Sequence, residues 1–343
     1  FQRCHVILDA GSSGTRALLC LFDVRRPVET ISQAWVLKVE PGLSACAEAY
    51  GSTRECAERR VASIVALTYH RARVELGLDS LAALSQVNLY ATAGLRLLTR
   101  SMQEQLLAGA ARAIDNSRFA ACVAPCARVI SGAEEAKFSW LSANVALGLA
   151  DSGAERGRLR TGSAAPTPST VAVLDMGGAS TQIAFVPSTT PTSATVQPLE
   201  VLNVAGVERS LYAVSRLGYG LNAMYSAVLR RGTGARASGS DAHAHPCLLR
   251  GVAERVESDE GVPAHYVGRG DFDACRSLIK GWVAKSEVDG LGGLGKSPRT
   301  PRLAAGQPIV LLDNFNYMLG ALWGGLNASV LATIPRARGG GGA

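Results

Sequence analysis

Short apolar runs and longer segments with helical spacing alternate along the chain. The apolar runs predict strands, which lie at 4–10 and 15–24, at the starts of 86–98, 127–150 and 307–334, and on both sides of a turn in 171–187. Amphipathic spacing predicts helices late in 41–78, at 101–114 and 210–231, and in the second parts of 86–98, 127–150 and 307–334. Polar segments rich in Gly, Ser and Pro predict loops at 151–170, 232–246 and 286–308. Strands and helices alternate in both halves, so the pattern predicts an α/β fold.

One segment of the first half is repeated in the second half. The stretch VILDAGSSGTRALLCLF begins at Val6, and VAVLDMGGASTQIAFVP begins at Val171. Each consists of an apolar strand that ends in Asp, a loop of small residues, and a second strand. The two strand-end carboxylates are Asp9 and Asp175. The repeat predicts two similar lobes that build one site between them.

A strand that ends in Asp and continues into a Gly-Ser loop suits phosphate chemistry. Glycines let the backbone turn with its N–H groups pointing inward, which forms a concave site for an anion. Ser and Thr hydroxyls add donors, and the Asp can hold a divalent cation through water molecules. One such loop alone is equally compatible with an ordinary β-turn, whereas two copies favour the phosphate interpretation. Neither loop is a Walker A sequence or a GxGxxG dinucleotide motif.

Two other segments contain residues of chemical interest. In ISGAEEAKFSW, the adjacent Glu134 and Glu135 follow a Ser-Gly turn at a predicted helix start. Carboxylates at this place also stabilise a helix through its dipole, but beside two phosphate loops one of them can serve as a general base that deprotonates water. In ATAGLRLL, Thr92 stands at a strand end and Gly94 permits close approach. A tight strand-to-helix junction explains the same two residues without any chemistry.

The composition indicates a globular chain of two domains or lobes. The sequence has 343 residues, of which 47% are hydrophobic and 18% charged. No apolar run approaches the length of about 18 residues that spans a bilayer. The net charge is +7, but the basic residues are scattered and not interleaved with aromatic residues, so no nucleic-acid partner is expected. The first predicted strand begins within a few residues of Phe1, so we expect that a signal or membrane anchor preceded it.

Eight cysteines leave the redox compartment open. An even number is compatible with disulfides in the secretory pathway, but cytosolic enzymes carry as many thiols. No CxxC pair is present, which argues against a zinc ribbon. His243, His245 and Cys247 resemble a set of metal ligands, but Pro246 and the Gly/Ser-rich loop around them argue against a metal site. The N-x-S sequon at Asn327 favours a glycosylated, secretory-pathway protein.

Four segments, in this order, resemble the conserved regions of the apyrase family, the nucleoside triphosphate diphosphohydrolases. They are DAGSSGTR, ATAGLRLL, ISGAEEAKFSW and LDMGGASTQIAF. The segments PGLS, LGYGLNAM and HPCLLRG are more similar to the Golgi and soluble diphosphatase branch, which includes guanosine and uridine diphosphatases, than to the cell-surface branch. The resemblance extends over residues 5–330.

The resemblance implies a fold, an activity and a location. The fold is an actin-like α/β fold of two ribonuclease-H-like lobes, expected at 1–131 and 132–343, with a nucleotide cleft between them. The activity is Ca²⁺- or Mg²⁺-dependent hydrolysis of the terminal phosphate of nucleoside di- or triphosphates, such as GDP, UDP and ATP, by direct attack of a water molecule. The location is the Golgi lumen or the outside of the cell, with membrane attachment only through a segment outside this chain.

The same resemblance assigns chemical roles to individual residues. Glu135 corresponds to the catalytic base, and Ser180 and Gln182 correspond to the residues that position the attacking water. Asp9 and Asp175 correspond to the carboxylates around a hydrated metal ion.

Further assignments concern the phosphate loops and the frame of the site. The expected phosphate-binding residues are Ser12, Ser13, Gly14, Thr15, Arg16, Gly177, Gly178, Ala179, Ser180 and Thr181. Thr92 and Trp140 correspond to residues that line the site, and Arg96 corresponds to a salt bridge between the lobes rather than to a phosphate ligand. Cys247 and Cys275 correspond to a disulfide pair of the family.

The chain departs from the family pattern at two places. Ala136 stands next to the expected base, where the third conserved region usually has Gly. A C-terminal region of the family, with cysteines and a fifth conserved region, has no counterpart, so we expect a chain that lacks a part that helps to bind the nucleotide base. Two other functions stay open. One is an exopolyphosphatase-like phosphatase of the same superfamily, and the other is a truncated protein that binds nucleotides without hydrolysing them.

Overall fold

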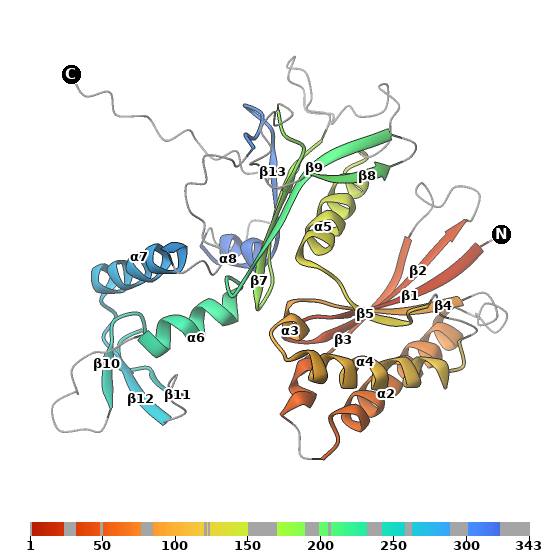
Figure 1. Cartoon of the computed structure of the whole chain (residues 1–343), viewed down its shortest axis with the longest axis horizontal. Coiled ribbons are helices and arrows are strands. Elements are labelled where there is room, and N and C mark those ends of the chain that lie inside the picture. The colour runs from red at the N-terminus through yellow and green to blue at the C-terminus, as the bar shows by residue number, and fades with distance from the viewer. Residues whose placement is uncertain are drawn as a thin grey trace.

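In the part of the chain that it describes, the computed structural model has three β-sheets with helices packed around them (Figure 1). The residues that it describes are 2–23, 32–48, 51–76, 85–119, 122, 124–149, 170–188, 199–204, 207–231, 242–257, 263–288 and 301–322. Most of the predicted loop 151–170, parts of the other two predicted loops, the sequon at Asn327 and the predicted helix beyond residue 322 lie outside the described residues.

The first sheet has five strands from the N-terminal part of the chain. They are β1 (Gln2–Ala10), β2 (Thr15–Asp23), β3 (Ser32–Val39), β4 (Ser85–Ala91) and β5 (Ala127–Val129), in the spatial order β3-β2-β1-β4-β5. β1, β2 and β3 pair antiparallel, whereas β4 and β5 run parallel to β1. Parallel strands need long crossover connections, and these contain η1 (Leu43–Ala47), α2 (Thr53–Leu76), α3 (Ala93–Arg96) and α4 (Arg100–Asp115). We call this sheet with its helices the first lobe.

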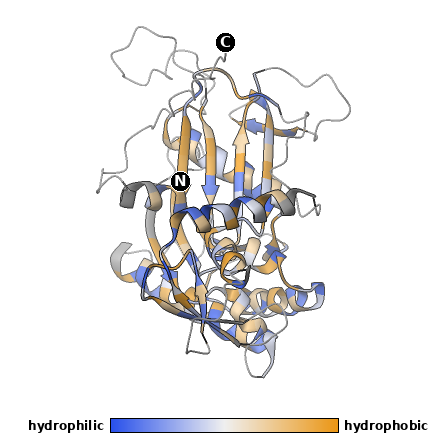
Figure 2. Cartoon of the chain, turned by 90° about the vertical axis from the view of Figure 1, so that its left-hand side faces the viewer, coloured by the Kyte–Doolittle hydropathy of each residue, from blue (hydrophilic) through white to orange (hydrophobic). Residues whose placement is uncertain are grey.

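Alternation along β1 explains how the first lobe forms its core. Val6 and Leu8 are fully buried, whereas Ile7 between them is partly exposed, because successive side chains of a strand point to opposite faces. Val61 of α2 and Leu106 of α4 pack into the same buried cluster. Figure 2 shows a similar contrast elsewhere in the chain, with long hydrophobic stretches on the upright strands and a mixture of hydrophobic and hydrophilic residues along the helices.

The second sheet also has five strands. They are β6 (Ala172–Met176), β7 (Ser180–Phe185), β8 (Glu200–Val204), β9 (Val207–Leu217) and β13 (Ile309–Asp313), in the order β13-β6-β7-β9-β8. β6, β7, β9 and β8 pair antiparallel, and β13 runs parallel to β6. Helix α5 (Gly132–Ala146) packs on this sheet through Trp140, and α8 (Asn314–Leu322) follows β13 directly. We call this sheet with α5 and α8 the second lobe.

The order β9-β7-β6-β13 repeats the order β3-β2-β1-β4, with the same parallel and antiparallel directions. The prediction of an α/β fold with two similar lobes is therefore confirmed. The first sheet ends at Val129 and α5 packs on the second, but the exact division of the domains at residues 131 and 132 stays a prediction.

A smaller unit lies between β9 and β13. It consists of α6 (Leu221–Arg231), β10 (His243–His245), β11 (Ala253–Glu257), β12 (Pro263–Gly268) and α7 (Phe272–Val288). Its three strands form a separate sheet in the order β10-β12-β11. The sequence patterns did not indicate this sheet, because the strands of the sheet are short and have few consecutive apolar residues. They did not indicate α7 either.

The predicted helix at 210–231 is wrong in its first half. Residues 207–217 form strand β9, and only residues 221–231 are helical. Leu211 and Ala213 face α5, whereas Tyr212 and Val214 pack with Phe185 on the other side of the sheet. A strand that is buried on both faces has no alternation of apolar and polar residues, so its sequence was taken for part of an amphipathic helix.

Three disulfides connect cysteines within the described residues. Cys46 is bonded to Cys56, Cys122 to Cys126, and Cys247 to Cys275. The last of these holds the turn after β10 to the first part of α7. Among the helices described here, none combines the length and the hydropathy that crossing a bilayer requires.

The crossing of α2 and α4 generates a prediction about two glycines. A Cβ atom on Gly109 of α4 would lie 2.2 Å from the carbonyl oxygen of Arg54 in α2, whereas Gly281 of α7 has open space around it. Gly109→Ala should therefore lower the free energy of unfolding by about 1–3 kcal/mol, as overpacking does. Gly281→Ala, the matched control, should raise it by about 0.5–1 kcal/mol through helix propensity. Chemical denaturation measures both, and equal effects of the two changes would contradict the close crossing.

Candidate active site

A cleft of about 490 Å³ lies between the two lobes, where β1 and β6 end. Its lining residues are Ile7, Asp9, Gly11, Ser12, Ser13, Arg16, Lys38, Tyr90, Thr92, Ala93, Ile130, Glu135, Phe138, Ser139, Asp175, Gly177, Gly178, Ala179, Ser180, Asp313, Asn314 and Tyr317. Both Gly-Ser loops, the N-terminal part of α5 and the end of β13 contribute to this lining. The site is therefore assembled from both lobes, and neither lobe contains it alone.

The two Gly-Ser loops contact one another through Ser12. A Cβ atom on Gly178 would lie 2.5 Å from the Oγ atom of Ser12, and one on Gly94 would lie 2.8 Å from its Cα atom. Such distances leave no space for a side chain at either position. At Gly94 the close atom belongs to the backbone of the loop after β1, so this approach requires glycine. At Gly178 the close atom is the Ser12 hydroxyl, which a side chain would displace.

Arg16 contacts carboxylates from both lobes. Its Nη1 atom lies 3.2 Å from Oδ2 of Asp9, and its Nη2 atom lies 4.0 Å from Oδ1 of Asp313. Burial raises the pKa of Asp9 above its ordinary value; Arg16 opposes this effect, and the negative charge of Asp313 adds to it. Asp313 also has a φ angle of 49°, which is unusual for a residue with a side chain but tolerated by Asp.

Asp175 has one oxygen atom with a partner and one without. The Oγ atom of Ser139 donates a hydrogen bond of 2.6 Å to Oδ2, whereas Oδ1 is buried and accepts no hydrogen bond from the described residues. Burial raises the pKa of Asp175 to about 6; the hydrogen bond from Ser139 opposes this effect, and the charges of Asp313 and Asp9 add to it. Buried carboxylate oxygens normally have donors, so the arrangement fits a ligand of Oδ1 such as the water shell of a cation.

The two adjacent glutamates of α5 make different contacts. Ser131 and Glu134 form a capping box, in which each side chain accepts a hydrogen bond from the other's backbone amide. Glu134 also contacts Arg128 at 2.9 Å. Burial alone would raise the pKa of Glu134, but the Ser131 amide and Arg128 hold it below its ordinary value. Glu134 thus stabilises the helix start, and Glu135 is the one that lines the cleft.

Arg96 joins Glu135 to the second Gly-Ser loop. Its Nη2 atom lies 2.5 Å from Oε2 of Glu135 and donates to Oγ of Ser180 at 3.2 Å, and its Nη1 atom donates to the carbonyl of Ile130. Both charged side chains of the pair are mostly buried. Burial raises the pKa of Glu135; Arg96 opposes this, and the charges of Asp175 and Asp9 raise it further. The pair connects α3 of the first lobe with α5.

Gln182 lies behind Ser180, away from the cleft. Its Nε2 atom donates to Oγ of Ser180 at 2.5 Å and to Oγ of Ser215 at 3.1 Å, and only 1% of the residue is exposed. Ser215 belongs to β9, which the sequence patterns assigned to a helix, so they gave no reason to place it here. Gln182 can therefore orient the Ser180 hydroxyl but does not itself line the cavity.

Several residues with expected roles do not line the cleft. Trp140 is 1% exposed and packs with Val173 and Leu211 in the core of the second lobe, so the expectation that it lines the site is corrected. The Oγ1 atom of Thr181 donates to the carbonyl of Tyr219, which stabilises the loop. Gly14, Thr15 and Gln182 are also absent from the lining, whereas the remaining loop residues and Thr92 are present in it.

Among the lining residues, seven with polar or aromatic side chains had no role assigned from the sequence patterns. They are Lys38, Tyr90, Phe138, Ser139, Asp313, Asn314 and Tyr317. One of them had a signal: the run IVLLD, which ends at Asp313, has the same apolar strand followed by Asp as the segments that end at Asp9 and Asp175. Ser139 had a second signal, because it stands four residues after Glu135 on the same predicted helix. The other five have no comparable signal, and the packing of the lobes brings them to the cleft.

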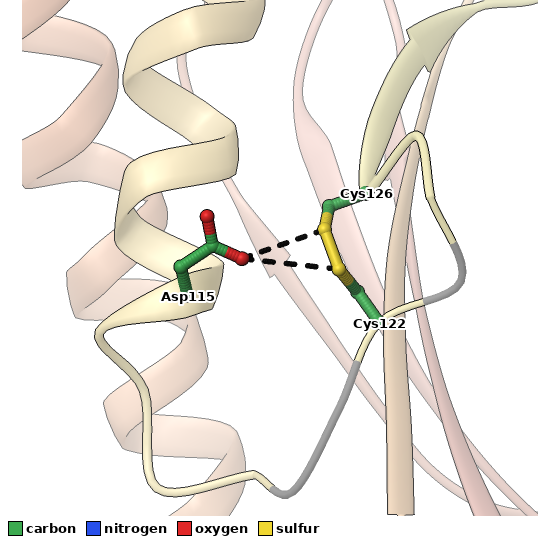
Figure 3. Close-up of side chains that lie close together, drawn as sticks. All are labelled: Asp115, Cys122 and Cys126. Carbon is green, nitrogen blue, oxygen red and sulfur yellow. Dashed lines mark hydrogen bonds between the residues drawn. A yellow bond between two sulfur atoms is a disulfide. The ribbon is translucent and has the colours of Figure 1, made fainter.

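Two other clusters of potential metal ligands lie outside the cleft. Asp115 lies beside Cys122 and Cys126, and its Oδ1 atom is within 3.8 Å of both sulfur atoms (Figure 3). These sulfurs are bonded to each other, so neither is available as a thiolate ligand. At the second cluster, both ring nitrogens of His245 contact backbone groups, and Cys247 is in a disulfide. Neither arrangement presents a set of free ligands.

The comparison with known families identifies the class of this chain. Residues 2–288 match the GDA1/CD39 (nucleoside phosphatase) family, and the chain belongs to that family. The match includes both Gly-Ser loops, Thr92 and Glu135.

Curated relatives are similar over much of this chain but are longer. Ectonucleoside triphosphate diphosphohydrolase 6 of Homo sapiens is 31% identical over 281 residues, which cover 80% of this chain and 53% of the relative. Probable apyrase 4 of Arabidopsis thaliana is 30% identical, covering 78% of this chain and 50% of the relative, and the Golgi apyrase of Schizosaccharomyces pombe is 28% identical, covering 83% and 50%. The chain thus spans about half the length of the curated relatives it matches.

A solved structure supports the fold. The crystal structure of nucleoside triphosphate hydrolases from Neospora caninum matches with a TM-score of 0.63 at 16% sequence identity, covering 94% of this chain and 75% of that chain. The predicted fold class, a two-lobed actin-like α/β fold, is confirmed.

The buried ion pair generates a prediction about Arg96. Arg96→Gln removes the cation that compensates Glu135, so the pKa of Glu135 should rise further, and the free energy of unfolding should fall by about 3–5 kcal/mol. A carboxyl NMR titration measures the pKa, and chemical denaturation measures the stability. Arg100→Gln is the matched control, because Arg100 forms an exposed ion pair with Glu104. This substitution should change neither the pKa of Glu135 nor the free energy of unfolding measurably. Equal behaviour of the two variants would contradict the role given to Arg96.

Proposed function

We propose that this protein hydrolyses the terminal phosphate of nucleoside di- or triphosphates by direct attack of a water molecule. The observation that carries the proposal is the position of Glu135, a cleft-lining carboxylate linked through Arg96 to Ser180, between two Gly-Ser loops of opposite lobes. Membership of a nucleoside phosphatase family supports the proposal. The related proteins named as apyrases and diphosphohydrolases support nucleotides as the substrates.

The two Gly-Ser loops would bind the phosphates. Ser12, Ser13 and Arg16 line the cleft from the first loop, and Gly177 and Gly178 line it from the second. Inward backbone N–H groups and hydroxyls suit phosphate oxygens without a full neutralising charge, and the guanidinium of Arg16 adds a charged donor. Aromatic residues at the same cleft suit a nucleoside base, and they are Tyr90, Phe138 and Tyr317.

Glu135 would act as the general base. An attacking water placed between Glu135 and Ser180 would transfer its proton to a carboxylate oxygen of Glu135 as its own oxygen bonds to the terminal phosphorus. The bond from that phosphorus to the bridging oxygen would break, which releases inorganic phosphate and leaves the electron pair on the remaining nucleoside mono- or diphosphate. Arg96 holds the carboxylate toward Ser180. Gln182 and Arg96 both donate to the Ser180 hydroxyl oxygen, so its hydrogen would be the group left to donate to the water.

Asp9 and Asp175 would hold a hydrated divalent cation, Ca²⁺ or Mg²⁺. The site fits such an ion, because the carboxylates offer hard oxygen ligands and the buried Oδ1 of Asp175 has no partner among the residues that the structure describes. When bound, the ion would neutralise charge on the phosphate oxygens. Asp313 contributes a third carboxylate at the same cleft.

The lumen of the Golgi or the outside of the cell is the proposed location. Three disulfides are typical of oxidising compartments, and one relative is named a Golgi apyrase. The proposal includes a preference for GDP and UDP. This preference rests on the similarity of PGLS and LGYGLNAM to the Golgi and soluble branch.

The activity is tested by phosphate release from GDP, UDP and ATP with Ca²⁺, with Mg²⁺, and with a chelator. We expect release from the nucleotides that needs the cation and stops with the chelator. Faster release from inorganic polyphosphate would instead support the exopolyphosphatase-like alternative. Thermal stabilisation by a non-hydrolysable nucleotide analogue without any turnover would support the protein that only binds nucleotides.

The adjacent glutamates provide a matched test of the base. Glu135→Gln should lower the rate of phosphate release by about 10²–10⁴-fold, because the amide cannot accept the proton of the attacking water. Glu134→Gln is the control: it changes the same side chain one residue away, and a Gln in a capping box can still accept from the Ser131 amide. The assigned mechanism is wrong if both variants release phosphate at the wild-type rate.

A further inference from the structure

Ser139 places a hydroxyl group in the cleft one helical turn after Glu135. Residues four apart lie on the same face of a helix, so α5 presents the carboxylate of Glu135 and the hydroxyl of Ser139 on its cleft side, and both line the cavity. The Oγ atom of Ser139 donates to Oδ2 of Asp175 at 2.6 Å. This distance is typical of a hydrogen bond to an ionised carboxylate.

The hydrogen bond from Ser139 makes the two oxygen atoms of Asp175 different. Because Ser139 occupies Oδ2, rotation of the carboxylate about its last bond would break a charge-assisted hydrogen bond, which contributes more than a neutral one. The plane of the carboxylate is therefore held, and Oδ1 stays buried without a donor from the described residues. A held carboxylate with one open oxygen is arranged for a ligand, since burial without any partner would be unfavourable.

We propose that Ser139 is a positioning residue that orients Asp175, so that Oδ1 accepts a hydrogen bond from the water shell of the divalent cation; this inference rests on the proposed function. Ser139 thereby couples the helix that carries the base to the strand end that holds the cation. Groups that orient the ligands of a metal site commonly contribute to affinity for the metal even though they do not contact it.

The same helix offers a matched control for this proposal. The Oγ atom of Ser142 donates to the backbone carbonyl of Ser139 at 3.0 Å, and the residue is exposed. Changing either serine to alanine raises helix propensity by a similar small amount. The two substitutions therefore differ in the bond to Asp175 and agree in their effect on the helix.

The test measures cation binding in the absence of nucleotide. Isothermal titration calorimetry with CaCl₂ and with MgCl₂ should show that Ser139→Ala weakens binding by about 10- to 100-fold, the usual loss for an orienting group. Ser142→Ala should bind like the wild type, and Ser139→Thr, which keeps the hydroxyl, should recover most of the affinity. Circular dichroism melting shows whether Ser139→Ala has folded. If it has not, Ser139→Cys, whose thiol is a weak donor, takes its place and is compared with Ser139→Thr.

The outcomes separate this inference from the proposed function. If Ser139→Ala binds both cations as the wild type does, or if the wild type binds neither, the positioning role is overturned. If the wild type hydrolyses nucleotides while Ser139→Ala keeps an unchanged cation affinity, the proposed function stands and this inference fails. Weakened binding in Ser139→Ala alone supports the positioning role, and a wild type that binds the cations but releases no phosphate counts against the proposed function only.

Discussion

A carboxylate buried between two lobes needs a compensating cation, and in this chain the pair of Arg96 and Glu135 meets that need. Arg96 belongs to the short helix that follows β4, Glu135 lies in the first turn of α5, and the same guanidinium reaches Ser180. One group therefore joins the first lobe, the helix with the candidate base and the second Gly-Ser loop. The place of Glu135 relative to the loops depends on this ion pair and on the close contact of Ser12 with Gly178.

The repeated strand order explains why three carboxylates meet in one cleft. β1 and β6 are equivalent strands of the two sheets, and each ends in Asp at the cleft, while β13 ends in Asp313 beside β6. Burial and mutual repulsion raise the pKa values of Asp9 and Asp175, and Arg16 and Ser139 oppose this effect. Accumulated negative charge of this kind is unfavourable for the fold alone and favourable for holding a cation.

Much of the fold was predictable where the signal was local. The hairpin around Gly11, its repeat around Gly177 and the helix start at Ser131 are specified by neighbouring residues, through turn chemistry and capping. Strand β9 was not predictable, because burial on both faces removed the alternation of apolar and polar residues. The contact of Ser215 in β9 with Gln182 was therefore missed as well. Trp140 lies in the predicted helix, but it packs in the core of the second lobe instead of lining the cleft. Packing decides which side of a helix meets a sheet.

By itself, the sequence determined the residue types of the site, the two Asp-loop hairpins and the α/β class, because short-range spacing encodes strands, turns and helix starts. Residue spacing left two adjacent glutamates as candidates for the base, and the family resemblance favoured Glu135. The tertiary structure shows where each side chain lies: Glu134 closes the capping box, and Glu135 turns to Arg96 and the cleft. Arg96, Ser139, Asp313 and Ser180 come from four different elements, and contacts between distant segments arise only when both lobes have folded and met.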